Sequence, residues 1–143
     1  MVELRGLDII GTVTTPGLNG IVFNTGQALH IDKRTIREFL NSYRRVRLTS
    51  WPTAASSLFV TDTRIINNGS GTGGAVSIKP SSGGSLHGTI SGVFAFGNVN
   101  GIVVDGTNAT VETAIYVNNT VSAGAAVAGI SAIIPTSGGA AVG

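Results

Sequence analysis

The sequence predicts a single all-β domain in which the chain coils repeatedly upon itself. A short phrase recurs along it, as NGIVF at 19–23 and NGIVV at 100–104, with looser copies at 45–48, 75–78 and 129–132. The copies lie about 25–30 residues apart, and self-similarity at such a period is typical of stacked repeats. The composition, with 21 glycines and only 11% charged residues, suits a β protein with many tight turns.

Runs of alternating apolar and polar residues precede the copies of the phrase and predict further short strands. Asparagine-containing turns follow at 67–69, 97–98 and 118–119, and stacked corners would align their amides into a ladder. Each repeat is too short for a strand followed by a crossover helix. A coil that pairs every strand with its equivalent in the next repeat satisfies this geometry.

Stacked coils would align inward-facing apolar residues into three columns. The first predicted column is Leu4, Ile31, Val60, Ile90 and Val111. The second predicted column is Ile9, Ile36, Ile65, Ala95 and Tyr116. The third, taken from the recurring phrase, is Ile21, Val46, Val76, Ile102 and Ile130. The coils are expected at residues 2–27, 28–54, 55–83, 84–108 and 109–138, with 139–143 as a frayed tail.

Several phrases carry a resemblance to a known family: GLDI (6–9), NGIVF (19–23), ALHI (28–31), SLFV (57–60) with IINN (65–68), and NGIVVDG (100–106). Over nearly its whole length the chain resembles the right-handed parallel β-helix superfamily of bacterial and phage proteins. That superfamily includes pectate lyases, polygalacturonases, epimerases, tailspikes and adhesins. The resemblance implies a right-handed single-stranded parallel β-helix of about five coils, and it favours an extracellular or cell-surface location.

The chain departs from the family pattern at its ends, where the sequence shows no clear cap. Open coil ends expose apolar surface and unpaired strand edges, which invite pairing with another chain. We therefore expect a homo-oligomer, end-to-end stacking, or a fragment of a longer protein. The N-terminal residues lack a signal-peptide pattern, and no apolar run is long enough for a membrane-spanning helix, so no membrane insertion is expected.

A second departure is a basic, aromatic-bearing segment at 33–51. Arginine makes forked contacts to carboxylate or phosphate, and it stacks on aromatic faces. An acidic polysaccharide is the ligand that the resemblance implies, and nucleic acid, held through phosphate contacts, is a second candidate. The alternative without a ligand is a solvated face balanced by Asp32 and Glu38. The candidate ligand-binding residues are Lys33, Arg34, Arg37, Tyr43, Arg44, Arg45, Arg47 and Trp51.

No catalytic or metal-binding group is expected. Glycoside hydrolysis usually needs two facing carboxylates, whereas Asp8, Asp32 and Asp62 fall at different offsets in neighbouring coils. His30 and His87 have no histidine or cysteine partner at metal-ligand spacing. The signature motifs of polygalacturonases are absent. No cofactor is therefore expected, and calcium would be expected only in a polysaccharide lyase.

These observations favour a non-catalytic structural or interaction module that associates with itself through open coil ends. A protein that binds or cleaves acidic polysaccharide, or a fragment of one, is the first alternative. Polyanion or nucleic-acid binding through residues 33–47 is the second. If the protein is an enzyme, the resemblance implies a polysaccharide lyase or a glycoside hydrolase.

Overall fold

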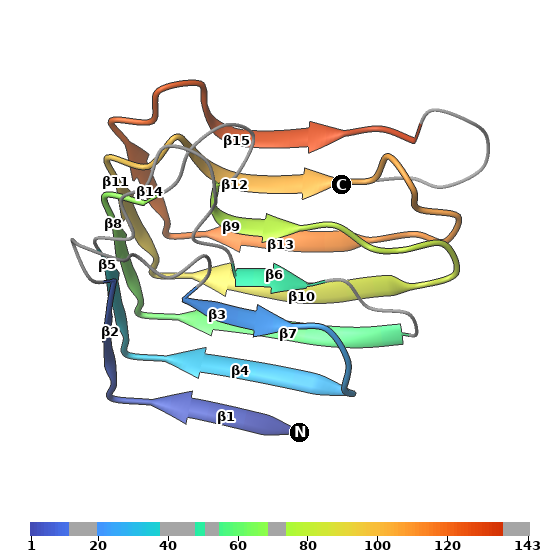
Figure 1. Ribbon diagram of the computed structural model, residues 1–143, viewed down its shortest axis with the longest axis horizontal. Coiled ribbons are helices and arrows are strands. Elements are labelled where there is room, and N and C mark those ends of the chain that lie inside the picture. The colour runs from blue at the N-terminus through green and yellow to red at the C-terminus, as the bar shows by residue number, and fades with distance from the viewer. Residues whose placement is uncertain (12–19, 38–47, 51–54, 69–73, 136–143) are drawn as a thin grey trace.

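The chain forms three parallel β-sheets that wrap around one interior, as the computed structural model shows (Figure 1). The structure describes residues 1–11, 20–37, 48–50, 55–68 and 74–135. In these residues every helix or strand assigned is a strand, and each third strand returns to the same sheet. The predicted all-β parallel solenoid is therefore confirmed.

We name the three sheets A, B and C and give their strands in order from the N-terminal coil. Sheet A contains β1 (Val2–Arg5), β4 (Ala28–Asp32), β7 (Ala55–Thr61), β10 (Ser85–Ser91) and β13 (Ala114–Asn118). Sheet B contains β2 (Asp8–Ile10), β5 (Thr35–Arg37), β8 (Arg64–Ile66), β11 (Phe94–Phe96) and β14 (Val121–Ala123). Sheet C contains β3 (Ile21–Phe23), β6 (Leu48–Ser50), β9 (Gly74–Ile78), β12 (Asn100–Asp105) and β15 (Ala128–Ile133).

Each coil contributes one strand to each sheet. Coil 1 consists of β1 to β3, coil 2 of β4 to β6, coil 3 of β7 to β9, coil 4 of β10 to β12 and coil 5 of β13 to β15. From β1 to β13 the chain makes about four full turns. All pairings between neighbouring strands in the three sheets are parallel, so each coil lies on the previous one in the same direction.

A residue with a left-handed backbone forms the corner between sheets A and B in every coil. The corner N–H donates to a carbonyl of the next coil, as from Asp62 to Ser91 at 3.1 Å. A left-handed backbone costs a residue other than glycine roughly 1–2 kcal/mol, so these inter-coil bonds offset the strain. The φ angles are 65° at Gly6, 54° at Lys33, 44° at Asp62, 65° at Gly92 and 42° at Asn119.

Two buried asparagines tie neighbouring coils together at the corner between sheets B and C. The side chain of Asn68 donates to the carbonyl of Ile36 at 3.2 Å, and that of Asn98 donates to the carbonyl of Ile65 at 2.9 Å. The amide oxygen of Asn98 also accepts the backbone N–H of Asn68 at 3.1 Å. The predicted amide ladder is thus present for these two residues. It does not extend to the turn at 118–119, which belongs to the other corner because Asn119 ends the passage from β13 to β14.

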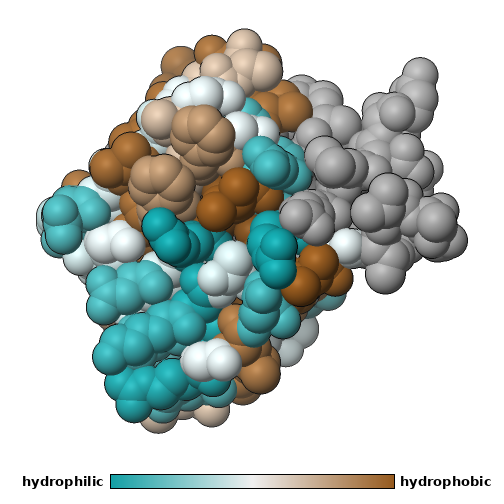
Figure 2. Space-filling view, turned by 90° about the vertical axis from the view of Figure 1, so that its left-hand side faces the viewer, coloured by the Kyte–Doolittle hydropathy of each residue, from teal (hydrophilic) through white to brown (hydrophobic). Residues whose placement is uncertain are grey.

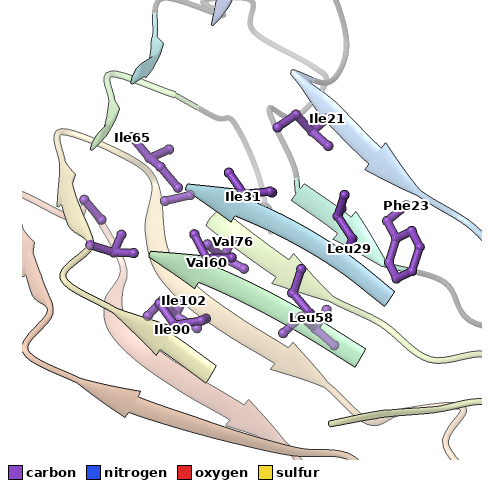
Figure 3. Close-up of a cluster of buried hydrophobic side chains, with 14 of the residues drawn as sticks. Ile21, Phe23, Leu29, Ile31, Leu58, Val60, Ile65, Val76, Ile90 and Ile102 are labelled. Carbon is purple, nitrogen blue, oxygen red and sulfur yellow. The ribbon is translucent and has the colours of Figure 1, made fainter. Parts of the chain in front are cut away.

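Aliphatic side chains fill the interior between the sheets. In Figure 3, Val60 and Ile90 of sheet A point toward Val76 and Ile102 of sheet C, and Ile65 extends from sheet B. Each of these five residues is at most 1% exposed. Because burial stabilises such a side chain by about 1.5–3 kcal/mol, coils 3 and 4 form the most stable part of the solenoid.

The first predicted column is correct except in coil 5. Val117, and not Val111, is in register with Ile90. Val111 precedes β13 and is 43% exposed. The loop between β12 and β13 is longer than an even repeat allows, and it shifts the inward position past Val111. The confirmed members, in register through sheet A, are Leu4, Ile31, Val60 and Ile90.

The second column has the same fault in coil 5. Ser122, and not Tyr116, is in register with Ala95. Tyr116 pairs with Thr89 in sheet A and is 75% exposed. Because neighbours in a strand point to opposite faces, Tyr116 must face outward when Val117 faces inward. The confirmed members, in register through sheet B, are Ile9, Ile36, Ile65 and Ala95.

The third column differs in coil 2. Leu48 is in register with both Ile21 and Val76, so it occupies the position predicted for Val46. Val46 itself lies outside the described residues. The inserted basic segment displaces the strand toward the C-terminus, and spacing alone did not reveal by how much. The confirmed members, aligned through sheet C, are Ile21, Val76, Ile102 and Ile130.

We predict that Ile102→Asp lowers the free energy of unfolding by about 3–5 kcal/mol, because it leaves an uncompensated charge in the interior. Urea denaturation measures the change. The matched control is Tyr116→Asp, at a position that the sequence placed in the core and the structure places outside; it should change stability by less than about 0.5 kcal/mol. Equal effects of the two substitutions would contradict the observed register.

Candidate functional site

The structure describes three of the eight predicted ligand-binding residues, and it separates them. Lys33 is exposed at the left-handed corner of coil 2, and Arg34 beside it is 2% exposed. Arg37 lies on the outer face of sheet B, where its guanidinium contacts Asp8 at 3.2 Å. These three side chains therefore do not form one continuous surface. The others, outside the described residues, are Tyr43, Arg44, Arg45, Arg47 and Trp51.

Arg34 is a buried arginine for which the described residues supply no hydrogen-bond acceptor. All three nitrogens of its guanidinium are buried without a partner. Burial lowers the pKa of Arg34, although the nearby carboxylates of Asp32 and Glu3 oppose this effect. The equivalent positions in coils 3 and 4 hold Thr63 and Val93, both of them buried. A cation at this inward position is therefore costly for the fold and is not presented to a ligand at the surface.

The acidic residue at the end of β4 is held in the ionised form by its neighbours. Asp32 accepts hydrogen bonds from the hydroxyl of Thr61 at 2.8 Å and from the guanidinium of Arg5 at 2.8 Å. These two bonds, with that from Thr61 the stronger influence, lower the pKa of Asp32. The three residues occupy one outward column across coils 1 to 3. Their role is to link coils along the outer surface of sheet A.

Asp105 plays a similar part at the turn that follows β12. Lys79 contacts its carboxylate at 2.7 Å, and the backbone N–H of Thr107 donates to it at 3.0 Å. Burial alone would raise the pKa of Asp105, but the hydrogen bonds from Lys79 and Thr107 outweigh burial and lower it. The pair Lys79–Asp105 therefore clasps coils 3 and 4.

The acids do not assemble a catalytic or metal site in the part of the chain that the structure describes. Asp8 is in register with Thr35, Asp32 with Thr61, and Asp62 lies at the corner beyond that column. Within the described ranges, no group of three or more histidines, cysteines, aspartates and glutamates could hold a metal ion. The different offsets expected from the sequence are thus what the structure has.

A pair of aromatic rings lies on the outer face of sheet B. Phe94 and Phe96 alternate with the inward-facing Ala95, and their rings are nearly parallel, with centroids 6.0 Å apart and planes 10° apart. Arg64, from the neighbouring strand, lies over the ring of Phe94 at 5.6 Å. We call Arg64, Phe94 and Phe96 the aromatic platform. Figure 2, which faces sheet B, shows hydrophilic side chains over the first coils and more hydrophobic ones over the last.

The aromatic platform escaped the sequence analysis, although a signal was present. The segment Phe94–Phe96 alternates aromatic, small and aromatic residues around a position predicted to face inward. Two aromatic residues on the outward positions of one strand are unusual for a solvated face, and Phe96 is 46% exposed. The basic segment at 33–51 drew attention instead because of its charge.

The two ends of the solenoid differ in chemistry. We call the free side of β13, β14 and β15 the C-terminal edge, and the free side of β1, β2 and β3 the N-terminal edge. The strands of the C-terminal edge contain no Asp, Glu, Lys or Arg, whereas those of the N-terminal edge contain Glu3, Arg5 and Asp8. Tyr116 and Ile130, on the C-terminal edge, are 75% and 59% exposed. The C-terminal edge is therefore apolar, uncharged and open among the described residues.

Comparisons with protein-family models, with curated proteins and with solved structures find no match to this chain. The parallel solenoid therefore stands on its own geometry. Searching the described residues for a helix long and apolar enough to span a membrane finds none.

We predict that Arg34→Leu raises the free energy of unfolding by about 1–4 kcal/mol, since replacing buried charge by apolar side chains of similar volume is often stabilising by that amount. Urea denaturation at neutral pH measures the change. Arg34→Lys, which keeps a buried cation, is the matched control and should give no such gain. A loss of stability in Arg34→Leu would show that the guanidinium has an acceptor.

Proposed function

We propose that the protein is a non-catalytic structural module that associates with further copies of itself through its open coil ends. The observation that carries the proposal is the C-terminal edge, where strand edges and apolar side chains are exposed together without a charge. Natural sheets protect such edges with charged residues, proline, bulges or a covering segment. Among the described residues β13, β14 and β15 have none of the charges and no covering strand.

The exposed apolar residues of this end are concentrated enough to act as one surface. Isolated apolar residues on a protein surface need no explanation, but contiguous ones mark interaction sites. Ile130 belongs to an inward column, so its 59% exposure arises only because no sixth coil covers it among the described residues. The exposed apolar residues of coil 5 and its flanks are Val111, Tyr116, Val121, Val127, Ile130, Ile133 and Ile134.

We predict that wild-type protein sediments as larger species when its concentration is raised, and that Ile130→Lys weakens this association at least about tenfold, equivalent to about 1.4 kcal/mol. The lysine remains solvated in the monomer but would have to lose its water in any stack. Sedimentation velocity over a concentration series measures both effects. Phe96→Lys, an exposed apolar position on the outer face of sheet B, is the matched control and should associate as wild type does. A wild-type protein that stays monomeric throughout would refute the proposal.

A second candidate function is binding of an acidic polysaccharide, and the aromatic platform supports it. A sugar ring presents an apolar face that fits an exposed aromatic ring, and a guanidinium makes forked contacts to a carboxylate. Among the described residues no carboxylate pairs with Arg64, which therefore has donors to offer. Phe94, Phe96 and Arg64 thus combine both requirements on one face.

We predict that Phe96→Ala weakens binding of alginate oligomers at least about fivefold, the loss of about 1 kcal/mol that marks an interface anchor. Isothermal titration calorimetry measures the affinity, with neutral dextran oligomers as the ligand control. Tyr116→Ala is the matched protein control, because Tyr116 is an exposed aromatic residue on a different sheet. Unchanged affinity in Phe96→Ala, or equal binding of dextran, would remove this candidate.

Nucleic-acid binding through residues 33–47 stays a prediction. Residues 38–47 lie outside the described part of the chain, and Arg37 already contacts Asp8. Of the two other described basic residues, Arg34 is buried, so only Lys33 is exposed to a phosphate. No feature of the described residues favours this function over the first two.

A further inference from the structure

We infer that the copies stack head to tail, with the C-terminal edge of one copy on the N-terminal edge of the next. The inference rests on the proposed self-association and adds which two surfaces meet. In such a stack coil 1 of the second copy takes the place of a sixth coil of the first. All three sheets continue, and the result is a heterologous contact that repeats along the solenoid axis.

The backbone hydrogen bonds of the corner between sheets A and B supply the first argument. In coils 1 to 4 the corner N–H donates to the next coil, as from Gly92 to Asn118 at 3.4 Å. In the opposite sense the first N–H of sheet B donates to the previous coil, as from Val121 to Val93 at 2.9 Å. Each internal junction therefore uses one donor and one acceptor from each of its two coils.

Continuing this pattern gives the partners at the junction between copies. The N–H of Asn119 would donate to the carbonyl of Arg5 in the next copy, and the N–H of Asp8 of that copy would donate to the carbonyl of Thr120. The corner angle of Asn119, 42°, is already that of the internal corners. The C-terminal edge thus presents the donor and acceptor that the N-terminal edge needs.

The side chains at the two edges are also compatible in this register. Extending the column of sheet A places Val117 against Leu4, which is partly buried against the core. Extending the outward column places the exposed Tyr116 beside Glu3, so the phenol can donate to a carboxylate. The charged side chains of the N-terminal edge therefore meet polar, uncharged groups and no like charge.

The uncovered apolar area of the N-terminal edge lies mainly on sheet A and its corner. Val2 and Leu7 are 54% and 52% exposed. On β3, in contrast, Ile21 and Phe23 are 8% and 6% exposed, so a second copy would gain little there. Contacts of β13 on β1 and of β14 on β2 would therefore dominate the junction.

A two-fold contact between two C-terminal edges fits the fold less well. A two-fold axis across the solenoid makes the facing strands antiparallel, and if it places sheet A on sheet A it must place sheet B on sheet C. The three-residue β14 would then face the six-residue β15. The corner donors and acceptors, which pair only between parallel coils, would find no partner.

Two variants, each blocked at one end, test the inference. Ile130→Lys blocks the C-terminal edge, and the double variant Val2→Lys/Leu7→Lys blocks the N-terminal edge, all at positions more than half exposed. Each variant alone should be monomeric, and their mixture should form a discrete one-to-one dimer that grows no further. Sedimentation velocity and native mass spectrometry on differently tagged variants measure the composition. Circular dichroism confirms the fold, and Ile134→Lys replaces Ile130→Lys if that variant unfolds.

The other outcomes separate this inference from the proposed function. Dimers formed by the double variant alone would show contact between two C-terminal edges, and dimers of Ile130→Lys alone would show contact between two N-terminal edges. Either result overturns the head-to-tail arrangement while self-association stands. The same holds if wild-type protein associates but the mixture forms no dimer. A wild-type protein that is monomeric at every concentration overturns both.

Discussion

Parallel pairing of each strand with its equivalent in the next coil is the constraint on which the structure depends. Because the register repeats, one inward position selects a whole column, and a single aliphatic choice is repeated through coils 1 to 4. The corners keep this register, since the left-handed residue of each coil bonds to the next one. The interior and the outer faces then follow from alternation along each strand.

The recurring phrase acquires a physical meaning from this pairing. Gly101, its second residue in coil 4, lies where coil 5 passes so closely that a Cβ would overlap the carbonyl of Gly129 and the hydroxyl of Ser122. The hydroxyl of Ser122 in turn donates to the carbonyl of Gly129 at 3.1 Å. Asn100 before it and Ile102 after it are buried in the same strand. The phrase thus combines a close approach between coils with one wall of the core.

The sequence predicted the architecture well because the repeat signal is carried by many residues, and it failed where one loop changed length. Val111 and Tyr116 satisfied the expected spacing, but the longer loop after β12 moved coil 5 out of step. Val46 failed in coil 2, where the basic segment precedes β6. Alternation within a strand survives such insertions, whereas spacing between strands does not. Anchoring each column on the strand pattern alone would have found Val117.

The candidate sites were harder to predict because they depend on which face a residue takes and on what lies beside it. Charge drew attention to Arg34 and Arg37, yet one is buried and the other contacts Asp8. Phe94 and Phe96 contribute through their mutual orientation, which composition does not encode. The openness of the coil ends was inferred from the lack of a cap pattern. The difference in charge between the two edges was visible only after the strands of coils 1 and 5 had been assigned.

That difference in charge bears on how a short solenoid avoids uncontrolled association. A parallel coil stack has two edges, and each one offers unpaired backbone groups to any extended chain. Arg5 and Asp8 hold their charges in place through ion pairs with Asp32 and Arg37 of coil 2. A foreign strand that approaches β1 or β2 must accommodate these fixed charges, whereas coil 5 of a second copy brings neutral groups in matching register. Charges on one edge alone would thus leave the N-terminal edge selective for its own kind, and selectivity of this form requires only that the opposite edge remain uncharged.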